Sequence, residues 1–257
     1  MSFDLALFEA EVATRGLALG SRVSWSDETT STNDDALAAA KAGALHGTLF
    51  GAETQSRGRG RRGNEWVSTP GAGLWFSLLL RPELRPELAP GLALCAGLAV
   101  RHALAARVAA KVLVKWPNDV LAGGKKVAGI LVESQFTSAQ VTCVVVGVGI
   151  NVTQAAFPEP IAELATSLSL LGAAELGRER LLSDVLEALE GELSRIGTYG
   201  LSAVAEALRP HDALFERRLR VGDVEGEGAG IDASGALLVR RQAGDVTAVV
   251  SGHVELL

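Results

Sequence analysis

The stretch Gln55-Ser-Arg-Gly-Arg-Gly-Arg-Arg-Gly-Asn-Glu-Trp66 places four arginines and three glycines in one short segment. It lies between residues 48–53 and 74–80, two apolar runs rich in strand-forming residues, so we expect a loop anchored at both ends. Glycines let backbone N–H groups approach a ligand closely, and guanidinium groups offer paired donors to carboxylates and phosphates. The segment therefore predicts a site for an anionic ligand.

Two alternatives for this arginine loop (residues 55–66) stay open on the segment alone, namely a solvated surface loop and an RGG-type tether for nucleic acid. The segment contains no GxxxxGK[ST] phosphate loop. A dinucleotide-binding glycine fingerprint is also excluded, because that fingerprint opens a helix and a strand is expected after this loop.

The composition describes a globular protein that is acidic overall. The 257 residues are 48% hydrophobic, which allows one large domain or one domain with a small satellite. Lysine and arginine number 24 against 30 acidic residues, and the net charge of −6 argues against a broad DNA-binding surface. A local basic loop remains compatible with that balance.

Cysteines and histidines give no sign of a disulfide framework or a metal site. Cys95 and Cys143 both lie in apolar runs and suit reduced core residues of a cytoplasmic protein. The four histidines lack metal-binding spacing, and no Gly-x-Ser-x-Gly elbow for a catalytic serine is present. The N-terminus lacks a signal peptide pattern, and no apolar run is long enough to span a bilayer.

The order of the predicted elements suggests two units. Helices are expected over residues 5–12, from the Ser31-Thr32-Asn33 turn to near Gly43, from after Pro82, Pro86 and Pro90 to about Ala110, and over 181–193 and 201–208; strands are expected around Val23 and Trp25, over 48–53, 74–80, 112–116, 127–135 and 141–150. The last two strands should form the centre of a sheet. Residues 119–124 are predicted to be a turn, with Gly123-Gly124 closing a tight hairpin. After a boundary near His211, short glycine-punctuated strands predict a small antiparallel barrel.

A second motif, Lys115-Trp116-Pro117-Asn118-Asp119, ends a predicted strand. A lysine at the end of a buried strand can present a desolvated ammonium group to a carboxylate or phosphate. Taken alone, the pentapeptide is equally compatible with a simple strand end followed by an Asx turn.

Two further stretches bring small or polar residues to predicted element ends. Ser31-Thr32-Asn33 opens a helix and could hydrogen-bond a neutral ureido or amide ligand, although helix capping alone would explain these residues. Gly147-Val-Gly-Ile-Asn151 ends a buried strand and would allow a nucleotide to approach the backbone, but a lone Gly-x-Gly is weak evidence.

Together these motifs resemble the biotin protein ligase family, also called biotin–acetyl-CoA-carboxylase ligase. The matching segments follow in the family's order, with Lys126-Val-Ala-Gly-Ile-Leu-Val-Glu133 between the second motif and the glycine strand. The resemblance implies an α+β fold similar to that of class II aminoacyl-tRNA synthetases: a mixed central sheet flanked by helices, in residues 1–210, followed by an SH3-like barrel in residues 211–257. It also implies the short class without an N-terminal DNA-binding repressor domain.

The implied reaction has two steps: ATP, as its Mg²⁺ complex, activates biotin to biotinyl-5′-AMP, and a lysine of a biotin carboxyl carrier protein or domain then receives the biotin. By motif match, biotin would contact Ser31, Thr32, Asn33, Gln55, Arg59, Gly60, Arg61 and Lys115; ATP or the adenylate would contact Gly58, Arg59, Arg61, Trp66, Lys115, Asn118, Gly149 and Asn151. Lys115 and Arg61 are the expected catalytic residues. Glu65 receives no role, and no protein-held metal is expected.

Two other functions compete with biotin ligation as readings of these motifs. Lipoate-attaching enzymes share the general catalytic fold, but the paired GRGRRG and KWPND motifs favour biotin. A catalytically silent module that sequesters biotin or binds RNA is disfavoured by the net acidity and by Lys115. A homodimer is expected from the family resemblance only.

Overall fold

The computed structural model describes residues 2–81, 91–136, 141–174 and 177–257. The chain break predicted at Pro82, Pro86 and Pro90 lies outside the described residues. The helices are α1 (Leu5–Arg15), α2 (Thr32–Lys41), α3 (Gly91–Ala105), α4 (Arg178–Tyr199) and α5 (Leu201–Leu208), with short 3₁₀ turns η1 (Arg61–Gly63) and η3 (Arg209–His211). The strands are β1 (Arg22–Thr29), β2 (Thr48–Gln55), β3 (Gly73–Leu80), β4 (Val112–Lys115), β5 (Asp119–Ala122), β6 (Lys125–Phe136), β7 (Val141–Asn151), β8 (Arg218–Val221), β9 (Val224–Ile231), β10 (Leu237–Arg240), β11 (Val246–Val249) and β12 (Val254–Leu256).

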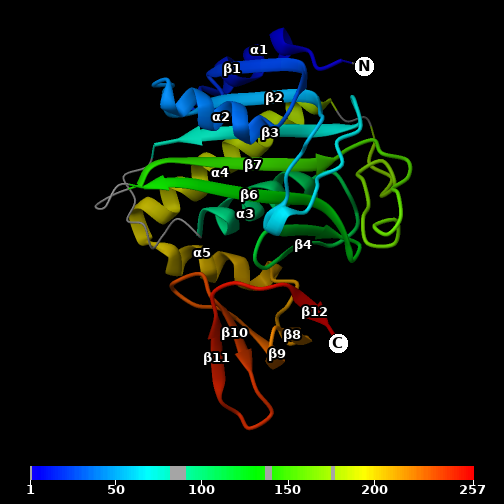
Figure 1. The fold of residues 1–257 in the computed structure, drawn as a ribbon, viewed down its shortest axis with the longest axis vertical. Coiled ribbons are helices and arrows are strands. Elements are labelled where there is room, and N and C mark those ends of the chain that lie inside the picture. The colour runs from blue at the N-terminus through cyan, green and yellow to red at the C-terminus, as the bar shows by residue number, and fades with distance from the viewer. Residues whose placement is uncertain (1, 82–90, 137–140, 175–176) are drawn as a thin grey trace.

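A seven-stranded mixed sheet forms the body of the molecule, with the strand order β1-β2-β3-β7-β6-β5-β4 (Figure 1). Its β1–β2 pair is parallel and the remaining pairs are antiparallel. The centre of the sheet is the antiparallel trio β3, β7 and β6. The prediction that residues 127–135 and 141–150 form the centre is confirmed, and the arginine loop connects β2 to β3 as expected.

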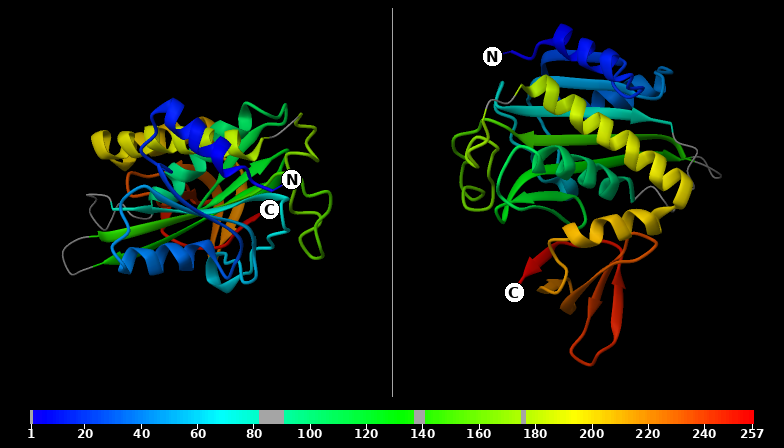
Figure 2. Two further views of the ribbon diagram at one scale, coloured as in Figure 1. Left: turned by 90° about the horizontal axis from the view of Figure 1, so that it is seen from above. Right: turned by 180° about the vertical axis from the view of Figure 1, so that it is seen from behind.

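Helices cover both faces of this sheet (Figure 2). On one face, α1, α3 and α4 pack over a large apolar cluster, to which β3 contributes Leu74, Phe76, Leu78 and Leu80. On the other face, α2 packs over a small cluster that includes Leu79. Because side chains alternate along a strand, Ser77 also faces the α2 side. The α2 face therefore carries a buried polar residue, Ser77, beside the small apolar cluster.

Local sequence explains how α1 begins and ends. Asp4 caps α1, and its side chain accepts a hydrogen bond from Leu7 N. Gly16 ends α1 in the left-handed conformation, with φ of +66°. Both interactions satisfy backbone groups that a helix end leaves without a partner within the helix. The expected N-terminal helix is thus confirmed.

Two predicted boundaries are wrong. The helix expected to run to about Ala110 ends at Ala105, because β4 begins at Val112 and the intervening residues return the chain to the sheet. Residues 119–122, predicted as part of a turn, form strand β5 between β4 and β6. Only Gly123 and Gly124 make the turn, both with positive φ, as the predicted hairpin requires.

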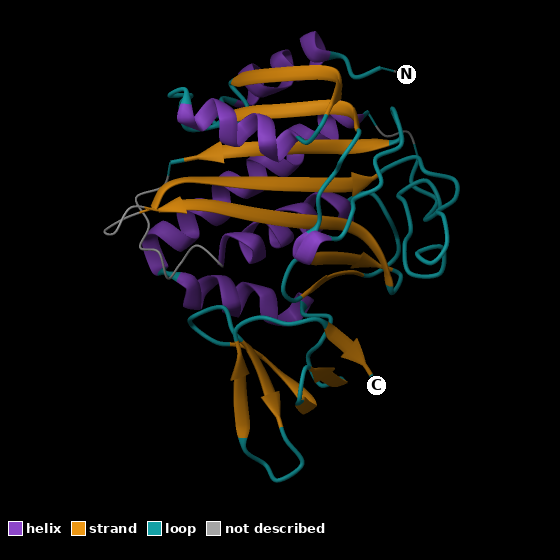
Figure 3. Ribbon diagram, in the orientation of Figure 1, coloured by secondary structure: helices purple, strands orange, loops and turns teal. Residues whose placement is uncertain are grey.

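The C-terminal residues form a separate five-stranded antiparallel sheet, ordered β11-β10-β9-β8-β12 (Figure 3). It contacts the unit formed by the large sheet through Trp116, whose indole Nε1 donates to the carbonyl oxygen of Gly235 at 3.0 Å. Ala213 N also donates to the carbonyl oxygen of Val114 at 2.9 Å. The predicted α+β class with a small C-terminal barrel is confirmed, while the boundary between 210 and 211 stays a prediction.

Both cysteines are free and buried, and they belong to the apolar clusters on opposite faces of the sheet.

Across the described ranges, none of the helices combines the length and the apolar character needed to cross a membrane.

Candidate active site

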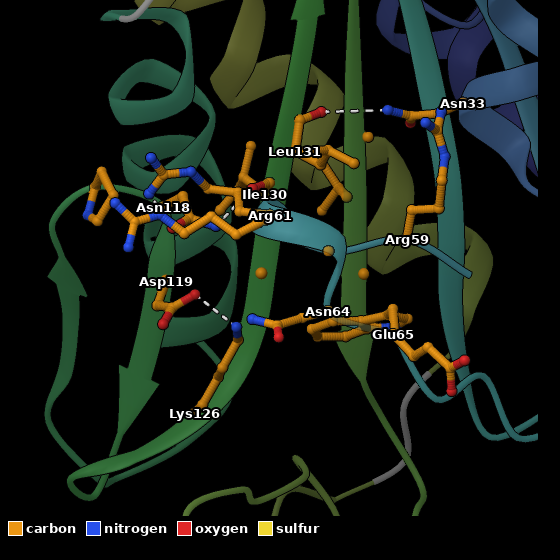
Figure 4. Close-up of a pocket in the computed structure, with 18 of the residues that line it drawn as sticks. Asn33, Arg59, Arg61, Asn64, Glu65, Asn118, Asp119, Lys126, Ile130 and Leu131 are labelled. Carbon is orange, nitrogen blue, oxygen red and sulfur yellow. Dashed lines mark hydrogen bonds and ion pairs between the residues drawn. The ribbon is translucent and has the colours of Figure 1, made fainter. Parts of the chain in front are cut away.

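A cavity opens on the α2 face of the large sheet, where the arginine loop passes over β6 and β7. Strand ends, the start of α2 and the arginine loop all supply its wall. Eleven residues predicted from the sequence line it: Ser31, Thr32, Asn33, Gln55, Arg59, Gly60, Arg61, Trp66, Lys115, Asn118 and Gly149. In Figure 4, Arg61 and Asn118 lie at one end of the cavity, with Asp119 and Lys126 nearby, and Arg59 lies on the other side, toward Asn33.

Glycines on the central strands make room for two of these side chains. A Cβ atom at Gly147 would overlap Oδ1 of Asn33. The Trp66 indole lies over the paired glycines Gly129 and Gly149, where added Cβ atoms would collide with the ring. The glycines of β7 are therefore needed because side chains from α2 and the arginine loop pack directly on the sheet backbone.

A buried chain of polar side chains lines the end of the cavity nearest α2. The Thr32 hydroxyl lies 2.7 Å from that of Ser77, which donates to Asn33 Oδ1 at 2.5 Å. Gln55 Oε1 accepts from Thr32 N at 2.9 Å. Ser31 is the N-cap residue of α2, yet its side chain makes no capping hydrogen bond. Capping alone therefore does not account for this group, which fits a neutral polar ligand.

Two acids hold Arg59 beside this polar chain. Glu133 Oε2 accepts from Asn33 Nδ2 at 2.7 Å and from Arg59 at 2.7 Å, and Oε1 accepts from the other guanidinium nitrogen at 3.1 Å. Asp34 lies 2.8 Å from the same guanidinium. The positive charge of Arg59 is therefore already balanced within the protein.

Arg61 faces the cavity and forms no ion pair with an acid among the described residues. Its guanidinium donates to Asn118 Oδ1 at 3.3 Å, and Asn118 is itself fixed because its Nδ2 donates to the carbonyl oxygen of Ile130 at 2.8 Å. Burial, together with the neighbouring Arg62, lowers the pKa of Arg61, and the charge of Asp119 offsets this only in part. An arginine stays protonated regardless, so a half-buried cation is left here that an incoming anion would stabilise.

Lys115, like the exposed Arg62, is a further cation that lines the cavity and forms no ion pair within the described ranges. It is half-buried at the end of β4, opposite Asp119 in the strand register. Asp119 instead pairs with Lys126. The Nζ atom of Lys126 lies 2.6 Å from the Asp119 carboxylate and 5.3 Å from the centre of the Trp66 ring. The cavity thus joins a neutral polar end to a cationic end, an arrangement suited to a ligand with a polar head and an anionic tail.

Comparison with known proteins identifies the chain. A sequence model of the Biotin/lipoate A/B protein ligase family matches residues 25–151. The bifunctional ligase/repressor BirA of Bacillus spizizenii is 33% identical over 244 residues, which cover 93% of this chain and 75% of that protein. This chain belongs to the biotin protein ligase family. The biotin–[acetyl-CoA-carboxylase] ligase of Mycobacterium tuberculosis is 38% identical to the ligase described here, covering 87% of this chain and 84% of that protein.

The fold of this ligase is also that of a solved relative. The biotin protein ligase from Aquifex aeolicus in complex with biotin and ATP superimposes with a TM-score of 0.79 and is 29% identical, covering 92% of this chain and 98% of that one. The fold expected from the motifs is confirmed by this agreement.

Two residues predicted for the adenylate do not line the cavity of the ligase. Gly58 is buried within the arginine loop, where its carbonyl oxygen accepts from Trp66 N at 2.9 Å. Asn151 is buried at the end of β7, and its Nδ2 donates to the carbonyl oxygen of Thr166 at 3.0 Å. Both therefore hold backbone segments in place, and their predicted ligand contacts stay predictions.

Several cavity residues of the ligase were not predicted. Phe76, Asp119, Lys126 and Leu131 line its wall. Ser77 and Glu133, which hold the polar chain without lining the cavity, were not predicted either, and their place on the strands was the available signal. Near the C-terminus, Gly252 and His253, just before β12, and Val254, at its start, also contribute to the wall, although no local motif marks them. Within the described residues, no group of three or more metal-ligating side chains is assembled.

Proposed function

We propose that this ligase joins biotin to ATP as biotinyl-5′-AMP and transfers the biotin to a lysine of a biotin carboxyl carrier protein or domain. The observation that carries the proposal is the union, in one cavity, of a neutral polar end with the unbalanced cations Arg61 and Lys115. The family membership and the relative solved with biotin and ATP support it.

The first step must bring two anions together. A biotin carboxylate oxygen attacks the α-phosphorus of ATP, the bond to the bridging oxygen breaks, and pyrophosphate leaves. Lys115 and Arg61 would offset the repulsion between carboxylate and phosphate and stabilise the charge that develops on the phosphoryl oxygens. Because neither side chain is neutralised by an acid among the described residues, neither has to be released first.

The other predicted residues divide between the two ends of the cavity. The polar chain of Thr32, Asn33 and Gln55, with Ser31 beside it, would hold the ureido head of biotin through hydrogen bonds. Trp66 would offer an aromatic face to the nucleotide. We assign no metal ligand to the protein, and Mg²⁺ would arrive with the phosphates of ATP, whose charge it offsets.

In the second step, the acceptor amine attacks the carbonyl carbon of the mixed anhydride and AMP leaves. The adenylate must stay away from water until that amine arrives. The arginine loop would close over the adenylate, a movement for which its glycines are suited. We further propose a cytoplasmic location, where ATP and carrier domains meet, and a homodimer, which sedimentation would test.

A transfer assay tests the proposal directly. The purified protein would be incubated with MgATP, biotin and a carrier domain, and mass spectrometry is expected to find one biotinyl group on the acceptor lysine. Controls omit ATP or replace the acceptor lysine with arginine. Mass gain with lipoate but none with biotin would instead assign the protein to the lipoate branch of its family.

A substitution at Gly147 tests the polar end of the cavity. In Gly147→Ala the new methyl group overlaps Asn33 Oδ1, which Ser77 and Glu133 hold in place, so we expect the KM for biotin to rise by about tenfold or more. Gly191→Ala is the control, because its added Cβ on α4 meets no atom within 4 Å. Steady-state kinetics decide the matter, and an unchanged KM in Gly147→Ala would remove Asn33 from the biotin site.

A further inference from the structure

Glu133 lies at the end of a continuous chain of hydrogen bonds that crosses the sheet surface. From Glu133 the chain passes to Asn33, then to the Ser77 hydroxyl, and then to the Thr32 hydroxyl at the cavity wall. These links measure 2.7, 2.5 and 2.7 Å. Ser77 and Asn33 are buried, so water is not available to replace a missing partner within the chain.

The direction of every hydrogen bond in this chain follows from the charge of Glu133. An ionised carboxylate only accepts, so Asn33 must turn its Nδ2 group toward Glu133 and its Oδ1 toward Ser77. The single hydroxyl proton of Ser77 is then used on Asn33 Oδ1. The oxygen of Ser77 must therefore accept from Thr32.

The last link decides what the cavity offers to a ligand. The Thr32 hydroxyl lies 2.7 Å from Ser77 and 3.2 Å from Gln55 Oε1. If its proton pointed to Gln55, two oxygens 2.7 Å apart would face each other without a proton between them, because the proton of Ser77 is already committed. The proton therefore lies between Thr32 and Ser77, and the Thr32 oxygen presents its lone pairs as acceptors.

We propose that Glu133 is a positioning residue which fixes the direction of this chain and so makes Thr32 an acceptor for an N–H group of the ligand. The proposal rests on the proposed function, in which that ligand is the ureido head of biotin. Glu133 does not line the cavity and acts through Asn33 and Ser77. Its second contact, with Arg59, holds the arginine loop beside the same chain.

Substitution of Glu133 by glutamine keeps the shape of the side chain, but the donors and acceptors along the chain of hydrogen bonds are no longer fixed. A glutamine can donate as well as accept, so Asn33 can rotate and each hydroxyl proton can point the opposite way. We expect the KM for biotin to rise by about tenfold while kcat at saturating biotin changes by less than about threefold, because the Thr32 oxygen is no longer held as an acceptor for the ligand N–H group.

Asp34→Asn is the matched control. The substitution removes the same charge, and the Asp34 carboxylate also contacts the Arg59 guanidinium, but the Asn33 side-chain amide donates to Glu133 and not to Asp34. We expect its KM for biotin to stay within about threefold of the unsubstituted protein, as for an exposed ion pair. An equal rise in both variants would assign the effect to Arg59 and overturn the proposal.

Ser77→Ala interrupts the chain without touching Glu133, and it supplies an independent readout. Alone, it should also raise the KM for biotin; combined with Glu133→Gln, it should remove most of the further effect of the glutamine, which a double-mutant cycle measures. Equal effects of Glu133→Gln in both backgrounds would show that the influence does not pass through Ser77. Calorimetry with biotin distinguishes a failure of the proposed function from a failure of the role assigned to Glu133. If the unsubstituted protein does not bind biotin, both fail. If it binds biotin and Glu133→Gln binds equally well, only the role of Glu133 is overturned.

Discussion

Lys115→Ala is expected to lower the rate of adenylate formation by about 10²- to 10³-fold, the range seen when a preorganised charge-stabilising group is removed. Lys115 is half-buried in the cavity wall and forms no ion pair with any described residue, so its full charge is available to the reacting carboxylate and α-phosphate. Its loss should leave the free energy of unfolding nearly unchanged, because no acid in the described part of the chain loses an ion-pair partner.

Pyrophosphate release in a single turnover, with biotin and MgATP saturating, measures this step apart from transfer. Lys125→Ala is the control, since Lys125 makes only an exposed ion pair with Glu163 at 3.4 Å and does not line the cavity. A Lys115→Ala protein that melts normally and releases pyrophosphate at the unsubstituted rate would remove Lys115 from the catalytic role.

The cationic side of the cavity was predictable because its residues lie in short motifs at element ends. Lys115 ends β4, and Arg61 lies on the loop between two apolar runs that predict strands. What joins these segments is the sheet order β3-β7-β6-β5-β4, which local patterns do not encode. The resemblance between whole motifs supplied that missing information.

The polar side was only partly predictable, because its connections are made across strands. Ser77 reads as an ordinary member of an apolar strand, and its hydroxyl acquires a role only when α2 places Thr32 and Asn33 above it. Asn151 shows the opposite case: a motif residue whose amide is used to hold the chain near Thr166. Strand β5 was missed because four residues beside two glycines carry a stronger turn signal than strand signal.

Arg178→Ala is expected to have the largest effect on folding, lowering the free energy of unfolding by about 3 to 5 kcal/mol, the cost of breaking a buried ion pair by removing one partner. Arg178 opens α4 and lies almost fully buried against Glu53 at the end of β2. Its guanidinium nitrogens lie 2.8 and 3.1 Å from the two oxygens of Glu53. The same carboxylate accepts from Phe3 N at 2.6 Å, so Glu53 also anchors the N-terminal segment.

The effect should depend on pH in a defined direction. Burial raises the pKa of Glu53, but the Arg178 guanidinium and the Phe3 N–H outweigh it and hold that pKa below the ordinary value of 4.5. A lowered pKa in the folded state stabilises the protein above the unfolded value, and this contribution is lost as the pH falls through the folded value. The difference between the two proteins should therefore be full at pH 7 and shrink below about pH 4.5.

Urea unfolding at several pH values, followed by circular dichroism, measures both effects. Arg180→Ala is the control on the same helix, because Arg180 is exposed and its ion pair with Glu11 at 3.2 Å should contribute less than about 1 kcal/mol. An Arg178→Ala protein no less stable than Arg180→Ala would show that the ion pair to Glu53 does not hold α4 against β2. A large loss that stays constant down to acid pH would place the stabilisation in the packing of the Arg178 side chain over Phe3, whose ring centre lies 5.8 Å from the guanidinium carbon, and not in the charge of Glu53.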